Sequence, residues 1–282
     1  MREKIKRGAS NFFKIITKPE MEILPGHLAF SFVISIVPTL TILTYIASIF
    51  HFDLHFINDF ISQAFSQEFA DMLLGVNMVI KADWNFFLTL IIAYIIASNG
   101  AASVIASSNM IYGIKNSSFF KRRLKSLFMI LIIILLFVFL LIFSVFGNKI
   151  IEMLQLMDIS EKIITNITLI ISVLKGPISW FIIFFFIKII FTMAPDKKIK
   201  SNEVNKGAIF TTIGFVVITY IYSIYTTNFA NYDVFYGNLA SIVVLMIWLY
   251  LLSYVFTIGL ALNYREEVII LEKTQKLNTV EK

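Results

Sequence analysis

The sequence predicts an all-α integral membrane protein built as a bundle of six transmembrane helices. Three observations lead to this prediction: the composition, the length of the apolar runs and the absence of acidic residues from them. The chain has 282 residues, of which 58% are hydrophobic and 15% are charged, and its mean hydropathy is +0.83. Soluble domains are typically about 45–50% apolar and about 25% charged, so this composition excludes an ordinary soluble domain.

Six apolar runs are each long enough to cross a hydrocarbon core of about 30 Å at about 1.5 Å per helical residue. None of them contains Asp or Glu, and only the fourth contains lysine. They do not alternate as transmembrane strands do, and a helix satisfies its own backbone polar groups in lipid. The predicted spans are residues 28–50, 85–108, 127–147, 169–193, 207–227 and 239–262.

Lysine and arginine are distributed unevenly between the two faces that six crossings define. Nineteen of the 24 lie before the first span, in the second and fourth connections and after the sixth span, against three on the other face. The positive-inside rule therefore places both termini in the cytoplasm. The basic cluster from Lys121 to Lys125 also suits anionic headgroups, so we expect membrane lipids as partners.

The spans divide the chain into three segments: a basic, cytoplasmic or interfacial segment 1–27, a transmembrane domain 28–262 and a cytoplasmic tail 263–282. We expect Pro19 and the pair Pro25–Gly26 to separate an interfacial stretch from the first span. In the outer connection at 51–84, apolar residues recur at helical spacing between acidic ones. This pattern predicts an amphipathic outer helix between the first and second spans.

The second span carries the densest group of small residues in the chain. The spacing of four between Ala93, Ala97 and Ala101 is typical of helices that pack closely together. Asn99 and Ser103, one turn apart, are also placed to line a polar path. The two interpretations are compatible, and both stay open at this point.

The fourth span holds two lysines, Lys175 and Lys188. A lysine within a span either extends to the interface or faces a polar partner inside the bundle. Gly176 and Pro177 predict a kink or break beside Lys175, and Pro38 predicts one in the first span. Because no span contains an acid, an anionic ligand is the one that these lysines favour.

Enzyme signatures are scarce. The chain has no cysteine, no P-loop and no G-x-S-x-G motif. His51 and His55 are one helical turn apart, but no further ligands accompany them, so we expect no metal and no cofactor. A ribonuclease needs a cytoplasmic cluster of acids or histidines, and only Asp196, Glu203 and His27 are available. We therefore expect neither an enzyme nor a nucleic-acid partner.

Several short motifs resemble a known family when they are taken in chain order. They are Val37-Pro38-Thr39, Asn109 to Tyr112, Pro195 followed by Gly207-Ala208, Tyr236-Gly237-Asn238, Trp248-Leu249-Tyr250 and Gly259 to Asn263. In this order they resemble the YihY/BrkB family of bacterial inner-membrane proteins, which is associated with virulence factors. The resemblance implies a six-helix, transporter-like protein of the bacterial inner membrane. An older label for the family, ribonuclease BN, is regarded as misassigned, so the resemblance does not imply ribonuclease activity. This chain departs from the family at Ala261, where a glutamate is often found.

We therefore expect a transporter-like protein that exports or translocates an anionic or amphiphilic substrate, with lipid-linked substrates included. The residues expected along its path are Lys188, Lys175, Asn99, Ser103, Tyr236 and Asn238. A non-transporting scaffold or envelope-assembly factor is the first alternative, and a membrane-associated ribonuclease is the second. A homo-oligomer is compatible with each of these interpretations.

Overall fold

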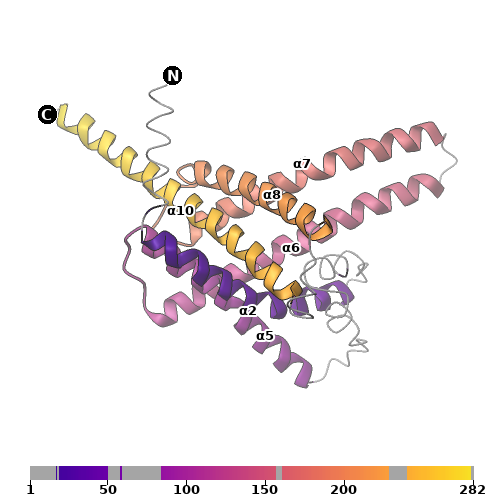
Figure 1. Cartoon of the computed structure of the whole chain (residues 1–282), viewed down its shortest axis with the longest axis horizontal. Helices are drawn as coiled ribbons and strands as arrows, with labels where there is room; N and C mark the ends of the chain where they lie inside the picture. The colour runs from indigo at the N-terminus through magenta and orange to yellow at the C-terminus, as the bar shows by residue number, and fades with distance from the viewer. Residues whose placement is uncertain are drawn as a thin grey trace.

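The computed structural model of the chain describes residues 17, 19–49, 58, 84–156, 161–228 and 240–280 (Figure 1). In these ranges it contains six α-helices and no strand, which confirms the predicted all-α class. The helices are α2 (Glu20–Ile49), α5 (Trp84–Ile111), α6 (Phe119–Leu156), α7 (Glu161–Met193), α8 (Asn205–Asn228) and α10 (Ala240–Val280).

Five segments among the described residues are long and apolar enough to cross a membrane. They are Glu20–Ile46, Phe87–Ile111, Gly176–Met193, Asn205–Tyr225 and Val243–Tyr264. The remaining predicted span, 127–147, lies within α6, and its crossing stays a prediction, as do the cytoplasmic termini. The predicted amphipathic outer helix falls almost entirely outside the described residues.

Each helix packs against the next helix in the chain, and the last one packs against the first. α2 packs against α5, α5 against α6, α6 against α7, α7 against α8, and α8 against α10, which returns to α2. α6 and α7 form an antiparallel hairpin whose two helices lie side by side in Figure 1. Because of this arrangement, the end of α7 lies beside the start of α6. The candidate site is built at that junction.

Apolar side chains face outward while hydroxyl groups lie between the helices. Every helix exposes large apolar residues, among them Phe30, Ile91, Leu135, Phe181, Ile213 and Ile247. Ser31, Ser98, Thr211, Ser253 and Thr257 are buried. An apolar exterior on this scale is typical of contact with lipid, and small hydroxyl residues at helix contacts are typical of membrane bundles.

The predicted separation of the first span at Pro25–Gly26 is wrong, because α2 begins at Glu20 and continues through both residues and through Pro38. The loss of one proline donor is local, and hydroxyl side chains bond nearby carbonyls in membrane helices. Next to Pro38, Thr39 Oγ1 donates to the carbonyl of Ser35 at 2.6 Å. The segment boundary drawn between residues 27 and 28 therefore falls inside a helix.

At Gly176–Pro177, where a kink or break is predicted, α7 continues through both residues without a break, and a kink there stays a prediction. Helix α10 is likewise continuous across residues 262 and 263, the predicted start of the tail.

Candidate functional site

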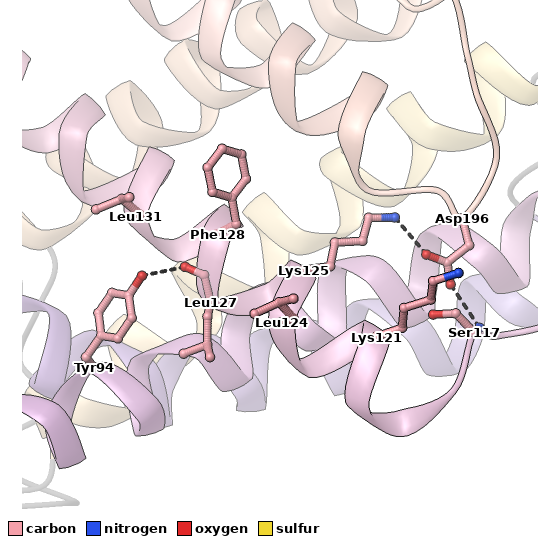
Figure 2. A pocket seen from close by; sticks show the side chains of 9 residues that line it. All are labelled: Tyr94, Ser117, Lys121, Leu124, Lys125, Leu127, Phe128, Leu131 and Asp196. Carbon is pink, nitrogen blue, oxygen red and sulfur yellow. Dashed lines mark hydrogen bonds and ion pairs between the residues drawn. The ribbon is translucent and has the colours of Figure 1, made fainter.

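A groove of about 680 Å³ runs along the first turns of α6 (Figure 2). One face of this helix forms its wall, because residues three and four positions apart lie on the same side of a helix. Tyr94 of α5 lies at one end. The other lining residues are Ser117, Lys121, Leu124, Lys125, Leu127, Phe128, Leu131 and Asp196.

The two ends of the groove differ in chemistry. Figure 2 shows Lys121, Lys125 and Asp196 together at one end, with Leu131 and Tyr94 at the other. At the apolar end the Tyr94 hydroxyl donates to the carbonyl of Leu127 at 2.6 Å, which joins α5 to α6. The groove therefore offers charge at one end and hydrocarbon along its length, as an amphiphile requires.

Asp196 is the centre of the polar end. Its Oδ1 accepts from Lys125 Nζ at 2.7 Å, and its Oδ2 accepts from Asn109 Nδ2 at 2.8 Å and from the Ser117 N–H at 3.0 Å. Its own N–H donates to Asn109 Oδ1 at 2.7 Å. One carboxylate thus joins the end of α5, the connection after it, α6 and the connection after α7.

These bonds also set the ionisation of Asp196. Burial alone raises the pKa of the carboxyl, but the hydrogen bonds from Lys125, Ser117 and Asn109 outweigh it and hold the pKa well below its ordinary value of 3.8. Asp196 is therefore an anion at neutral pH. It forms a neutral pair with the lysine beside it.

Lys125 has no capacity left for another ligand. Besides Asp196, its ammonium donates to the carbonyls of Ala194 and Pro195, each at 2.8 Å. A lysine has three donor hydrogens, so these three bonds occupy all of them. The two carbonyls follow directly after the last residue of α7, where a cation is also favoured by the helix dipole.

Lys121 differs from Lys125 in this respect. Its side chain is exposed, and no described residue forms a hydrogen bond or ion pair with its ammonium. The groove therefore carries one available cation at its polar end. That charge is not balanced by Asp196, which Lys125 already neutralises.

The turn after α5 directs the chain into this site. Gly113 has a φ of +64°, in the left-handed region that favours glycine. The N–H of Ile114 donates to the carbonyl of Asn109 at 2.8 Å, and that of Gly113 donates to Met110 at 3.2 Å. These two bonds form a Schellman C-cap, which ends α5 and sends residues 114–118 toward Asp196.

A second polar contact joins α5 to α6 on the side away from Lys125. Arg123 donates from Nη1 to Asn99 Oδ1 and from Nη2 to the carbonyl of Ile95, each at 2.8 Å. Asn99 is exposed, whereas Ser103 is buried and donates to Ser31 Oγ at 2.6 Å. Asn99 and Ser103 therefore contact different helices.

The small residues of α5 form the predicted close contact. Ala97 and Ala101 are fully buried, and the N–H of Gly100 donates to Ser35 Oγ at 2.8 Å. A Cβ at Gly100 would lie 3.0 Å from Ser35 Oγ, so the absence of a side chain lets α2 and α5 approach. The interpretation of this stretch as a helix contact is confirmed.

Of the expected path residues that are described, none lines the groove. Lys188 is half-buried on α7, with Nζ 6.0 Å from the centre of the Phe184 ring. Lys175 lies in α7, but its side chain is outside the described part, and Tyr236 and Asn238 lie outside the described residues altogether. A contact of these four residues with substrate stays a prediction.

The comparisons with known proteins decide the family. The model of the family described as "Virulence factor BrkB" matches residues 13–280. The chain belongs to the BrkB family. A relative from Bacillus subtilis, named the ribonuclease-like protein YfkH, is 31% identical over 64% of this chain and 63% of its own length. The match therefore spans less than two thirds of that relative.

Shorter matches connect the chain to bacterial membrane proteins. A UPF0761 membrane protein of Idiomarina loihiensis is 28% identical over 33% of this chain and 34% of its own. A UPF0761 membrane protein of Alteromonas mediterranea is 33% identical over 22% of this chain and 21% of its own length. No solved structure gives a significant match. Together with the apolar helices, these matches identify a multi-pass membrane protein.

The motifs that resemble the BrkB family come together in pairs. Asn109 bonds Asp196, the residue after Pro195. Gly207 and Asn263 also meet, because the N–H of Gly207 donates to Asn263 Oδ1 at 2.8 Å. A Cβ at Gly207 would lie only 2.2 Å from the Gly259 carbonyl, so α8 and α10 are in direct backbone contact there.

The candidate path residues predicted from the sequence did not include Tyr94, Lys121, Lys125 or Asp196. A signal for Lys121 and Lys125 was present, because these lysines share a helical face with Leu124, Phe128 and Leu131. For Asp196 no local signal exists, since its partners lie 71 and 87 residues away in the chain.

Proposed function

We propose that this BrkB-family protein is a transporter that moves an anionic amphiphile, lipid-linked substrates included, across the bacterial inner membrane. The observation that carries the proposal is the groove on α6, which combines an available cation with an apolar wall. A substrate with an anionic head and a hydrocarbon tail complements both ends of the groove. Export, with the head group taken from the cytoplasmic side, follows from the predicted orientation.

The chemistry of the groove also ranks the alternatives. A general base needs a pKa near the working pH, and the bonds from Lys125, Ser117 and Asn109 hold the pKa of Asp196 well below its ordinary value. This favours transport over the ribonuclease activity suggested by the name of the Bacillus subtilis relative. The ammonium of Lys121, which has no described partner in a groove with an apolar wall, suits a ligand with an anionic head. A scaffold does not require such a charge, so this favours transport over the scaffold as well.

Lys188 is the second part of the proposal. It lies in the candidate span Gly176–Met193 and is half-buried beside Phe184. We assign it, with Lys175, as a countercharge for the anionic head deeper in the membrane. The homo-oligomer that the sequence allows is not needed for the groove, whose described lining comes from one chain.

Purified protein in liposomes tests the proposal. We expect protein-dependent movement of a fluorescent anionic phospholipid between leaflets and none of a soluble anion of the same charge. Lys188→Ala is expected to slow this movement, while Lys198→Ala, an exposed lysine outside the spans, leaves it unchanged. Movement of the soluble anion alone would replace the proposal with a solute carrier. Inactivity toward both probes would favour the scaffold.

A further inference from the structure

We infer that the groove binds an anionic phospholipid of the cytoplasmic leaflet, with its phosphate on Lys121 near the end of α5. This inference rests on the proposed function, because it names the substrate class of the same groove. It adds two claims: which side chain holds the head group, and from which leaflet the lipid comes.

The first step is the choice of cation. Lys125 donates all three of its hydrogens to Asp196, Ala194 and Pro195, so it positions the polar end but binds nothing further. The ammonium of Lys121, one turn earlier on the same face, has no described partner. An incoming phosphate therefore meets one ammonium with its donors available and a neighbouring pair that is already neutral.

The second step concerns the tail of the ligand. From Lys121 the groove continues along Leu124, Phe128 and Leu131 toward Tyr94. Leu124 and Phe128 are 61% and 55% exposed, so their surface is open to an acyl chain. A soluble anion leaves this apolar wall uncovered, whereas a phospholipid covers it and reaches Lys121 at the same time.

The third step is the side of the membrane on which the polar end lies. Asn109, near the end of α5, donates to Asn116 Oδ1 at 2.9 Å and to Asp196 at 2.8 Å. Asp196 also accepts from the Ser117 N–H and from Lys125. The polar end of the groove therefore lies at the end of α5.

The consequence is that Lys121 lies near the end of the candidate span Phe87–Ile111 rather than at its middle. The predicted orientation places that end on the cytoplasmic side. A lysine there attracts the anionic head groups of the adjacent leaflet. A phospholipid of the cytoplasmic leaflet therefore meets the available ammonium with its tail along the apolar wall.

Binding is tested by native mass spectrometry of the full chain with dioleoyl-phosphatidylglycerol as the probe. We expect Lys121→Gln to weaken binding about fivefold, the size of one lysine–headgroup interaction. Lys121→Glu weakens it further, and the matched control Lys198→Gln leaves it unchanged. Dioleoyl-phosphatidylcholine, which has no net charge, binds weakly to all variants. Equal loss in Lys121→Gln and Lys198→Gln would overturn the assignment, and so would full competition by glycerol 3-phosphate.

These tests separate the inference from the proposed function. Phospholipid that binds at Lys121 without crossing the bilayer would refute transport and leave the site intact. Phospholipid that crosses equally fast in Lys121→Gln would refute the site and leave transport intact.

Discussion

Asn109 and Asp196 lie 87 residues apart and bind each other in both directions. The amide Nδ2 of Asn109 donates to the carboxylate at 2.8 Å, and the backbone N–H of Asp196 donates to the amide oxygen at 2.7 Å. Asn109 is fully buried. This pair connects the end of α5 to the connection between α7 and α8, and with Lys125 it forms the polar end of the groove.

Removing the carboxylate should destabilise the protein. Asp196→Ala removes one acceptor from the partly buried ammonium of Lys125 and one from the amide of Asn109, which costs about 2–3 kcal/mol in the free energy of unfolding. Thermal unfolding in detergent measures the loss. The double variant Asp196→Ala with Lys125→Ala is expected to recover part of it. A single variant as stable as wild type would contradict the role of this carboxylate.

The same carboxylate predicts a pH dependence. Its pKa is lower in the folded protein than its ordinary value of 3.8, so folding favours the charged form. The stabilisation is complete above that value and is lost as the pH falls below it toward the folded pKa. The difference in unfolding temperature between wild type and Asp196→Asn is therefore largest at neutral pH and shrinks on acidification below 3.8. A difference that grew with acidification would have the wrong sign.

Gly207 should tolerate no side chain. Its Cβ would lie 2.2 Å from the Gly259 carbonyl and 2.4 Å from Asn263 Oδ1, so Gly207→Ala must push α8 and α10 apart. We expect a loss of about 1–3 kcal/mol, typical of overpacking. Gly176→Ala is the matched control, because nothing lies within 4 Å of a Cβ there. Equal effects of the two substitutions on SDS-induced unfolding would refute the close contact.

Arg123 should not be replaceable by lysine. Its guanidinium bonds Asn99 and the carbonyl of Ile95 at once, and an ammonium cannot reproduce this fork. Arg123→Lys and Arg123→Ala are therefore expected to lose similar amounts of stability, about 0.5–1 kcal/mol for an exposed contact. Thermal unfolding in detergent measures both losses. Full rescue by lysine would show that charge alone matters.

The sequence was sufficient for the helices and insufficient for the site. Apolar runs of span length predicted six helices because their length and composition are local properties. Asp196 and Asn109 could not be paired in this way, since helix packing alone brings them together. The break expected at Pro25 was mispredicted for the opposite reason: the surrounding helix overrides a local breaker there. The small residues around Ala97 were interpreted correctly because their spacing of four is itself the packing signal.

The central claim is that Lys121 in the groove on α6 serves the movement of an anionic lipid. The most direct measurement is bleaching of fluorescent phosphatidylglycerol by external dithionite in liposomes that contain wild type, Lys121→Gln or Lys198→Gln. We predict that wild type and Lys198→Gln expose the inner-leaflet lipid to bleaching at the same rate and that Lys121→Gln is several-fold slower. Bleaching of Lys121→Gln liposomes at the wild-type rate, or no difference between wild type and protein-free liposomes, would contradict it.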